Sequence, residues 1–379
     1  MGRMRILFAC GGTAGHINPA IAVANHIKER RPETEILFAG NPDGMEARLV
    51  PQAGYGFAPI KVLGIQRRLS LANLKNNVKA LWYLAGSGAR AAKIIKDFAP
   101  DVVFGTGGYV SGPVLRKASQ LGYKTIAMEN NAYPGVTTKL LARYVDKMLL
   151  AVEECKEHLP PDKDYVVTGN PVRDGILTAG RSAAREFYGV GDRVCIVSFG
   201  GSLGAQRLNE AVADLMAWHL KEGKNFLHIH ASGSYYKPEE YIEMLRERGV
   251  NAGEHKNLIL REYINDMPRC LAAADLVICR AGAMTLAELE AAGRASVLIP
   301  SPNVAENHQY HNAMVLVEHG AAAVIEEKEL SGRLLCETVE ALSRDPSKLR
   351  ELGENARKLA VLDANDRICS EIYAMAAKT

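Results

Sequence analysis

Short apolar runs alternate with glycine-rich turns and helical stretches along most of the chain. The first such unit has a strand over 5–10, a glycine turn at 11–15 and a helical pattern over 20–30. Similar units begin at 101–104, 194–199 and 276–279. Strands that alternate with helices in this way predict parallel sheets covered by helices.

Two of the glycine turns form a quasi-repeat. GGTAG at 11–15 and GGSLG at 200–204 both follow a strand, open a helix and lie about half a chain apart. We therefore expect two doubly wound α/β domains whose strand ends and helix N-termini face a shared cleft. The expected domains cover 1–164 and 165–359, with a proline-rich linker near 160–164, and the final helix of 360–379 packs back on the first domain.

Composition narrows the class of protein. The 379 residues are 47% apolar and 23% charged, which excludes a disordered, collagenous or coiled-coil chain. The part up to residue 165 carries a net charge of +8 and the rest −5, an asymmetry typical of a domain that faces an anionic surface such as a membrane or nucleic acid. Seven scattered cysteines without a CxxC pair favour neither a zinc site nor disulfides, and fit a reducing cytoplasm. With no signal sequence and no apolar run of about 18 residues, we expect a soluble or peripheral protein.

Glycine turns that open onto helix N-termini present backbone N–H groups, which suit a phosphate or diphosphate. Tight packing would explain one such turn, but four turns that converge indicate a nucleotide. Neither repeat has the lysine of a Walker A motif or the spacing GxGxxG, which disfavours ATP hydrolysis and dinucleotide binding.

Two side chains have positions that suit chemistry. Glu288 lies early in the helix that follows 280–282, where its carboxylate can accept both hydroxyls of a ribose; taken alone, it is better explained as a carboxylate stabilised by the helix dipole. His16 directly follows the first glycine turn, and imidazole is a natural general base near neutral pH, although a lone histidine is often structural. The DKD at 162–164 resembles a metal-binding DxD motif, but its place before a strand and after two prolines favours a solvated turn, so no metal is expected.

Seven motifs occur in one order: GGTAGHINPA, GTGGYVSGP, ENNAYPGVTTK, GNPVR, FGGSLGAQ, CRAGAMTLAELEAAG and HQYHNA. In content and spacing, over residues 5 to about 325, this set resembles the MurG family of bacterial glycosyltransferases. The resemblance implies a GT-B fold, two facing Rossmann-like domains, and an inverting, metal-independent reaction without a cofactor. N-acetylglucosamine passes from UDP-GlcNAc to the 4-hydroxyl of the muramic sugar of lipid I, giving lipid II and UDP for peptidoglycan synthesis.

The resemblance also implies a peripheral protein on the cytoplasmic face of the plasma membrane, with lipid I bound by the first domain. Its partners would include proteins of cell-wall synthesis or division, and no nucleic acid. Two rivals remain: a GT-B enzyme with a soluble acceptor, and an inactive nucleotide-sugar-binding scaffold.

Site residues carry over by motif. His16 matches the proposed general base, and Glu129 lies with it at the cleft. The acceptor-side loop contains Tyr109, Ser111 and Gly112. The residues implied to bind UDP-GlcNAc are Thr13, Ala14, Gly15, Asn131, Arg173, Ser202, Ile264, Ala283, Met284, Thr285, Leu286, Ala287, Glu288 and Gln309. Arg173 and Ser202 are expected near the diphosphate, Ile264 beside the uracil, Glu288 on the ribose diol and Gln309 on the sugar hydroxyls.

Three positions depart from the family pattern: Ala14 replaces a glycine, and Met128 and Asn130 replace the histidine and glutamine of its HEQN element. Alanine at 14 requires that this residue avoid positive φ, because a Cβ atom penalises that region.

The segment 61–96 contains eight basic residues and no acidic one. Within it an apolar stripe at helical spacing has lysines beside it: Leu71, Leu74, Lys75, Val78, Lys79, Leu81, Trp82 and Ala85. This pattern is typical of a helix that lies on an anionic membrane, and equally, from sequence alone, of a core-facing helix with a basic outer face. The polyprenyl acceptor that the resemblance implies favours the membrane.

Overall fold

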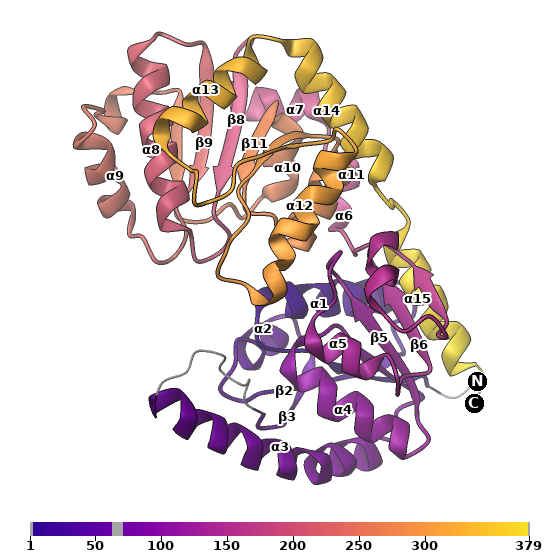
Figure 1. The fold of residues 1–379 in the computed structure, drawn as a ribbon. Helices are drawn as coiled ribbons and strands as arrows, with labels where there is room; N and C mark the ends of the chain where they lie inside the picture. The colour runs from indigo at the N-terminus through magenta and orange to yellow at the C-terminus, as the bar shows by residue number, and fades with distance from the viewer. Residues whose placement is uncertain (1–2, 63–70, 378–379) are drawn as a thin grey trace. The chain divides into compact units, whose positions relative to one another are not determined.

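The computed structural model describes residues 3–62 and 71–377. The chain divides into two compact units, unit 1 (Met1–Val172 and Asp363–Thr379) and unit 2 (Arg173–Leu362). Each is built on a parallel sheet with helices on its faces (Figure 1). The predicted fold class, two doubly wound α/β domains, is thereby confirmed.

Unit 1 contains a seven-stranded parallel sheet in the order β3-β2-β1-β4-β5-β6-β7. Its strands are β1 (Arg5–Ala9), β2 (Glu35–Gly40), β3 (Gly56–Pro59), β4 (Val102–Gly105), β5 (Lys124–Glu129), β6 (Lys147–Leu150) and β7 (Tyr165–Val167). Its helices are α1 (Ala14–Arg30), α2 (Glu46–Gln52), α3 (Leu71–Phe98), α4 (Gly108–Gln120), α5 (Val136–Leu141), the 3-10 helix η1 (Glu153–His158) and α15 (Ala364–Ala376).

The alternation of side chains in β1 explains the layers of unit 1. Ile6 and Phe8 pack in one core cluster with residues of α1, α2 and α15. Leu7 and Ala9 point to the opposite face, where they pack with residues of α3, α4 and α5. Because β1 is buried on both faces, it reads as a continuous apolar run.

Unit 2 repeats this design with six parallel strands in the order β10-β9-β8-β11-β12-β13. The strands are β8 (Val194–Phe199), β9 (Phe226–Ala231), β10 (Leu258–Arg261), β11 (Leu276–Cys279), β12 (Ala295–Leu298) and β13 (Ala323–Val324). The helices are α6 (Asp174–Thr178), α7 (Arg181–Phe187), α8 (Gln206–Lys221), α9 (Pro238–Arg246), α10 (Met267–Ala273), α11 (Ala283–Ala292), α12 (His308–Glu318), α13 (Gly332–Ser343) and α14 (Pro346–Leu359), with short 3-10 turns η2 (Ala252–Glu254) and η3 (Ala305–Asn307).

The chain passes between the units twice. The segment 160–164, expected as a linker, is a turn inside unit 1, because the strand β7 that follows pairs with β6. Unit 1 therefore continues to Val172, whereas the sequence boundary falls after residue 164. The last helix, α15, belongs to unit 1, where Asp366 pairs with His26 of α1 at 2.9 Å.

One predicted helix begins earlier than expected, and part of the predicted basic segment lies outside the described residues. Helix α1 begins at Ala14, inside the predicted glycine turn, because Thr13 is the last extended residue (φ −137°, ψ 157°). The predicted basic segment 61–96 includes most of the long helix α3, which continues to Phe98. Residues 63–70 of the basic segment, which include Arg67 and Arg68, lie outside the described residues. The side chains of the apolar stripe also lie outside the described part of the structure.

The seven cysteines are buried thiols. None of the helices described is both long enough and apolar enough to cross a membrane.

Candidate functional site

Both sheets have a point where the strand order reverses, between β1 and β4 in unit 1 and between β8 and β11 in unit 2. In open α/β sheets, ligands bind outside the carboxyl ends of the strands at such points. The glycine turns of the quasi-repeat follow β1 and β8, and the GTGG and RAG segments follow β4 and β11. Each unit thus presents one candidate half-site.

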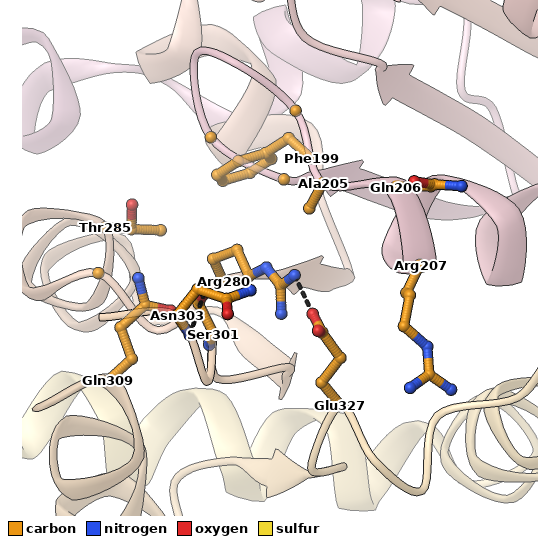
Figure 2. Close-up of a pocket in the computed structure, with 14 residues that line it drawn as sticks. Phe199, Ala205, Gln206, Arg207, Arg280, Thr285, Ser301, Asn303, Gln309 and Glu327 are labelled. Carbon is orange, nitrogen blue, oxygen red and sulfur yellow. Dashed lines mark hydrogen bonds and ion pairs between the residues drawn. The ribbon is translucent and has the colours of Figure 1, made fainter. Parts of the chain in front are cut away.

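In unit 2 this position is a cavity of about 480 Å³. Figure 2 shows Thr285 and Gln309 on one side, Gln206 and Arg207 on the other, and Arg280 between them. The full lining is Phe199, Gly200, Gly201, Gly204, Ala205, Gln206, Arg207, Arg280, Gly282, Thr285, Ser301, Asn303, Gln309 and Glu327.

Two helix N-termini open into this cavity. Ala205 and Gly282 are the N-cap residues of α8 and α11, and neither residue carries a side-chain acceptor that could cap its helix. The first amides of both helices are therefore available to a ligand, and both dipoles present their positive ends. Such an arrangement suits a diphosphate.

Arg280 and Glu327 form a nearly buried ion pair on the cavity wall, with side chains 13% and 11% exposed (Figure 2). Nη1 of Arg280 also donates to the carbonyls of Ile299 (3.1 Å) and Pro300 (3.3 Å). Arg280 thus fixes the segment after β12, and its charge is largely neutralised by Glu327.

Gln309 has a defined orientation. Its Oε1 accepts a hydrogen bond from the backbone N of Ser301 at 2.8 Å. Because a backbone N–H can only donate, the oxygen must face Ser301 and the NH2 group remains for a ligand. Gln309 is therefore suited to donate to an oxygen of a bound sugar.

Arg173 and Glu288 form an ion pair. The Nε and Nη2 atoms of Arg173 donate to the two carboxylate oxygens of Glu288, both at 2.6 Å. The Glu288 side chain is 9% exposed and that of Arg173 46%. The structure thus brings together two predicted donor-site residues as a bidentate ion pair.

The other predicted residues of unit 2 divide into two groups. Ser202 lies in the turn whose glycines line the cavity, and Thr285 lines it directly. Leu286 and Ile264 are buried. Ala283, Met284 and Ala287 of α11 are half-buried and, like Ile264 and Glu288, are not among the lining residues.

In unit 1, His16 lies in the first turn of α1 with its Nδ1 atom 3.0 Å from the carbonyl of Thr106, which follows β4. A carbonyl can only accept, so Nδ1 carries the proton and Nε2 has a lone pair. Burial lowers the pKa of His16, and the charge of Glu129 and the bond to Thr106 oppose this effect only in part. The imidazole is therefore neutral and able to accept a proton near pH 7.

A glycine at position 107 leaves space for the His16 ring. Gly107 has φ +99°, and a Cβ atom there would lie 2.8 Å from Nδ1 of His16. Asn130 supports the same carbonyl, since its Nδ2 donates to Thr106 O at 3.3 Å. The acceptor of the His16 hydrogen bond is thus held from two sides.

The Glu129 carboxylate is fully engaged. Its Oε1 accepts from the backbone N (3.0 Å) and Nδ2 (2.8 Å) of Asn131, and its Oε2 from the N of Gly135 (3.1 Å) and the hydroxyl of Thr138 (2.5 Å). This pattern orders the loop 130–138. It suits a residue that positions others better than one that takes up a proton.

The remaining predicted residues of unit 1 are distributed as follows. Thr13 and Gly15 are exposed at the N-terminus of α1, and Ala14 adopts helical φ, so the condition that alanine imposes there is met. Ser111 is buried, with its hydroxyl 2.7 Å from Ala9 O and 2.6 Å from Gly107 O. Tyr109 and Gly112 are half-buried.

Sequence reasoning missed Arg207, Arg280, Ser301, Asn303 and Glu327 in the cavity wall. Arg280 follows a strand at the switch point, a position that could have identified it. Glu327 lies in an ordinary charged run, and only the fold brings it to Arg280.

Comparisons with known proteins match both parts of the chain to one glycosyltransferase family. Residues 6–150 match the Glycosyltransferase family 28 N-terminal domain, and residues 195–368 match the Glycosyltransferase family 28 C-terminal domain. The chain is 43% identical over 366 residues, 96% of each chain, to the UDP-N-acetylglucosamine–N-acetylmuramyl-(pentapeptide) pyrophosphoryl-undecaprenol N-acetylglucosamine transferase of Acetivibrio thermocellus. The protein of the same name from Desulfitobacterium hafniense strain Y51 is 42% identical over 96% of this chain and 97% of its own.

Solved glycosyltransferase structures have a similar fold over nearly the whole chain. The crystal structure of Acinetobacter baumannii MurG superposes with a TM-score of 0.77 at 27% identity, over 98% of this chain and 100% of that one. The calicheamicin glycosyltransferase CalG4 has a TM-score of 0.70 at 16% identity, over 100% of both chains, which shows a shared fold alone.

Proposed function

We propose the following role for this chain, which belongs to the MurG family within glycosyltransferase family 28. It is an N-acetylglucosamine transferase that carries the sugar of UDP-GlcNAc to the undecaprenyl-linked muramyl pentapeptide, lipid I, and so makes lipid II. The observation that carries the donor assignment is the cavity of unit 2, where two uncapped helix N-termini and Gln309 surround one space.

On the donor side, the amides of the turn 200–205 and of the start of α11 bind the diphosphate, with Ser202 beside it. Gln309 donates to a hydroxyl of the N-acetylglucosamine, which its fixed amide orientation supports. Glu288 accepts the ribose hydroxyls through the lone pairs that Arg173 does not use, and Arg173 lies near the diphosphate.

On the acceptor side, Nε2 of His16 takes the proton of the 4-hydroxyl of the muramic sugar. The hydroxyl oxygen attacks the anomeric carbon of the donor, and the bond from that carbon to UDP breaks with its electron pair. One displacement inverts the configuration. The bond from Nδ1 to Thr106 O orients the ring and stabilises the imidazolium that forms.

Glu129 acts in this scheme as a positioning residue. Four donors already occupy its carboxylate, and its charge lies close enough to affect His16. It keeps Asn131 and the loop 130–138 in place beside the base.

Unit 1 docks on the cytoplasmic face of the plasma membrane through residues 61–96. The helical conformation of α3 and its run of basic residues support this. Val136 and Leu140 of α5 and the following Tyr144 add exposed apolar side chains, and Arg116 of α4 lies over the Tyr144 ring. A peripheral enzyme in this position meets its polyprenyl-linked acceptor directly.

An assay of UDP release tests the transfer. Release that depends on lipid I, with formation of lipid II, is the expected result. Release with soluble sugar acceptors, or none with either acceptor, would contradict the proposed reaction.

A further inference from the structure

We propose that Glu46 is a positioning residue for the transfer: its buried carboxylate occupies the anion-binding turn of unit 1 and fixes that turn in the form that supports His16. The proposal rests on the proposed role of His16. It assigns a function to a buried acidic side chain that the mechanism above does not use.

Glu46 is the first residue of α2, and it is completely buried. Its Oε1 accepts from the backbone N of Asn41 at 2.9 Å, and its Oε2 from the backbone N of Gly12 at 3.3 Å. No ion pair of Glu46 occurs within residues 3–62 and 71–377. A buried carboxylate is costly unless hydrogen bonds compensate it, so these two amides are its main support.

Three glycines surround this carboxylate. A Cβ atom would lie 2.3 Å from Oε1 of Glu46 at position 11, 2.6 Å from its Cγ at position 40, and 2.4 Å from its Oε2 at position 44. Contacts below 3.0 Å require something to move, so a side chain at any of the three positions would displace Glu46. The local sequence is therefore built around the acid.

The turn that Glu46 holds is in contact with the surroundings of His16. A Cβ atom on Gly108 would meet the carbonyl oxygen of Gly11 at 2.0 Å, so the turns after β1 and β4 pack backbone to backbone. Gly107, the next residue back, lies against Nδ1 of His16. A shift of the turn at Gly11 and Gly12 would reach the imidazole through these contacts.

The counterpart of this turn in unit 2 has no such acid. Gly12 and Gly201 have nearly the same φ, +93° and +95°. The amide of Gly12 is taken by Glu46, whereas Gly201 lines an open cavity. Glu46 thus takes the place that a ligand's anion has in the second turn.

Glu46→Gln tests this proposal, because it keeps the size of the side chain and places an NH2 group against one of the two N–H donors. Glu157→Gln, an exposed position of unit 1, is the matched control. We expect faster hydrogen exchange in peptides covering 9–17 and a kcat reduced ~10- to 100-fold by misplacement of the base. UDP affinity and the exchange of 199–206 should not change.

Glu46→Asp is the second variant, since it keeps the charge but is one methylene too short to reach both amides. We expect a similar loss of kcat, and this variant decides the matter if the glutamine form does not fold. The proposal is overturned by wild-type kcat in the folded variants, by unchanged exchange of 9–17, or by a parallel loss of UDP affinity and kcat. If the wild type itself shows no transfer to lipid I, the proposed function fails, and the exchange measurement still tests the hold of Glu46 on the turn.

Discussion

The second glycines of the two quasi-repeat turns have nearly the same φ, but the amides of the two turns have different surroundings. After β1, the amide of Gly12 binds Glu46 inside the protein, and the following helix carries His16. After β8, Gly200, Gly201 and Gly204 line an open cavity beside Arg207 and Arg280. We therefore expect the turn after β8, whose glycines line a cavity, to be the one that binds the anion of a ligand.

The two units have different roles in the proposed reaction. We propose that unit 2 supplies most contacts to the donor, and that unit 1 holds the base together with the donor contacts expected of Thr13, Ala14, Gly15 and Asn131. Mutations in the unit 2 cavity should therefore change binding without changing the reactivity of the base, and mutation of the base should do the reverse.

The largest effect is expected for His16→Ala, which removes the base. The kcat should fall ~100- to 10,000-fold, whereas UDP-GlcNAc affinity, which we assign mainly to the unit 2 cavity, should stay nearly intact. Turnover at saturating lipid I and calorimetry with UDP-GlcNAc measure the two quantities. Wild-type turnover would place proton removal elsewhere.

Apart from His16, whose pKa burial also lowers, the units differ in their buried histidines. His26 of unit 1 pairs with Asp366, whereas unit 2 buries His219, His228 and His230, whose pKa values burial lowers, to about 4 for His219 and about 3 for His230. Since these folded pKa values lie below the ordinary 6.5, the unfolded chain takes up protons first. The stability of unit 2 should be complete above pH 6.5 and should decrease as the pH falls from 6.5 toward 4.

His219→Leu isolates one of these groups, because both ring nitrogens of His219 are buried without a hydrogen-bond partner. The free energy of unfolding should then decrease less steeply with acid, by ~1.4 kcal/mol per pH unit in that window. Denaturant unfolding at several pH values measures the slope. An unchanged slope would mean that His219 is not a source of the acid sensitivity.

Glu288→Gln should weaken UDP-GlcNAc and UDP alike, because the ribose is common to both. The expected loss is ~1 to 3 kcal/mol, the range for a hydrogen bond to a charged group. Calorimetry with both ligands measures it, and His16→Ala serves as the control from the other unit. Unchanged UDP affinity would remove Glu288 from the ribose site.

The smallest effect concerns the basic part of unit 1. Lys75→Glu combined with Lys79→Glu should reduce sedimentation with anionic vesicles, because each charge near the surface contributes ~1 kcal/mol to the binding free energy. The double variant should remain folded. High salt should have the same effect on the wild type. Equal sedimentation of both proteins at low salt would show that docking does not use this segment.

Periodicity and glycine turns were sufficient to predict the fold. The strands at Val194–Phe199 and Leu276–Cys279 have the predicted bounds, because apolar runs between turns leave little choice of register. The start of α1 was missed, since a helix that begins within a glycine turn has no local signal. The continuation of unit 1 through β7 depends on pairing with β6, which no local pattern encodes.

The partners of the site residues could not be predicted in the same way. Arg173 and Glu288 are far apart in the chain, as are Arg280 and Glu327, and Gly12 and Glu46. Each pair depends on which strand ends the topology places side by side. Sequence reasoning can identify the residue types that suit the chemistry, but which of them neutralise one another follows only from the fold.

We propose that the turn after β8, and not the turn after β1, binds the donor's diphosphate. Hydrogen exchange of the wild-type protein with and without saturating UDP tests it most directly, through peptides covering 9–13 and 199–206. We expect slower exchange in 199–206 and no change in 9–13. Protection of 9–13 without protection of 199–206 would contradict it.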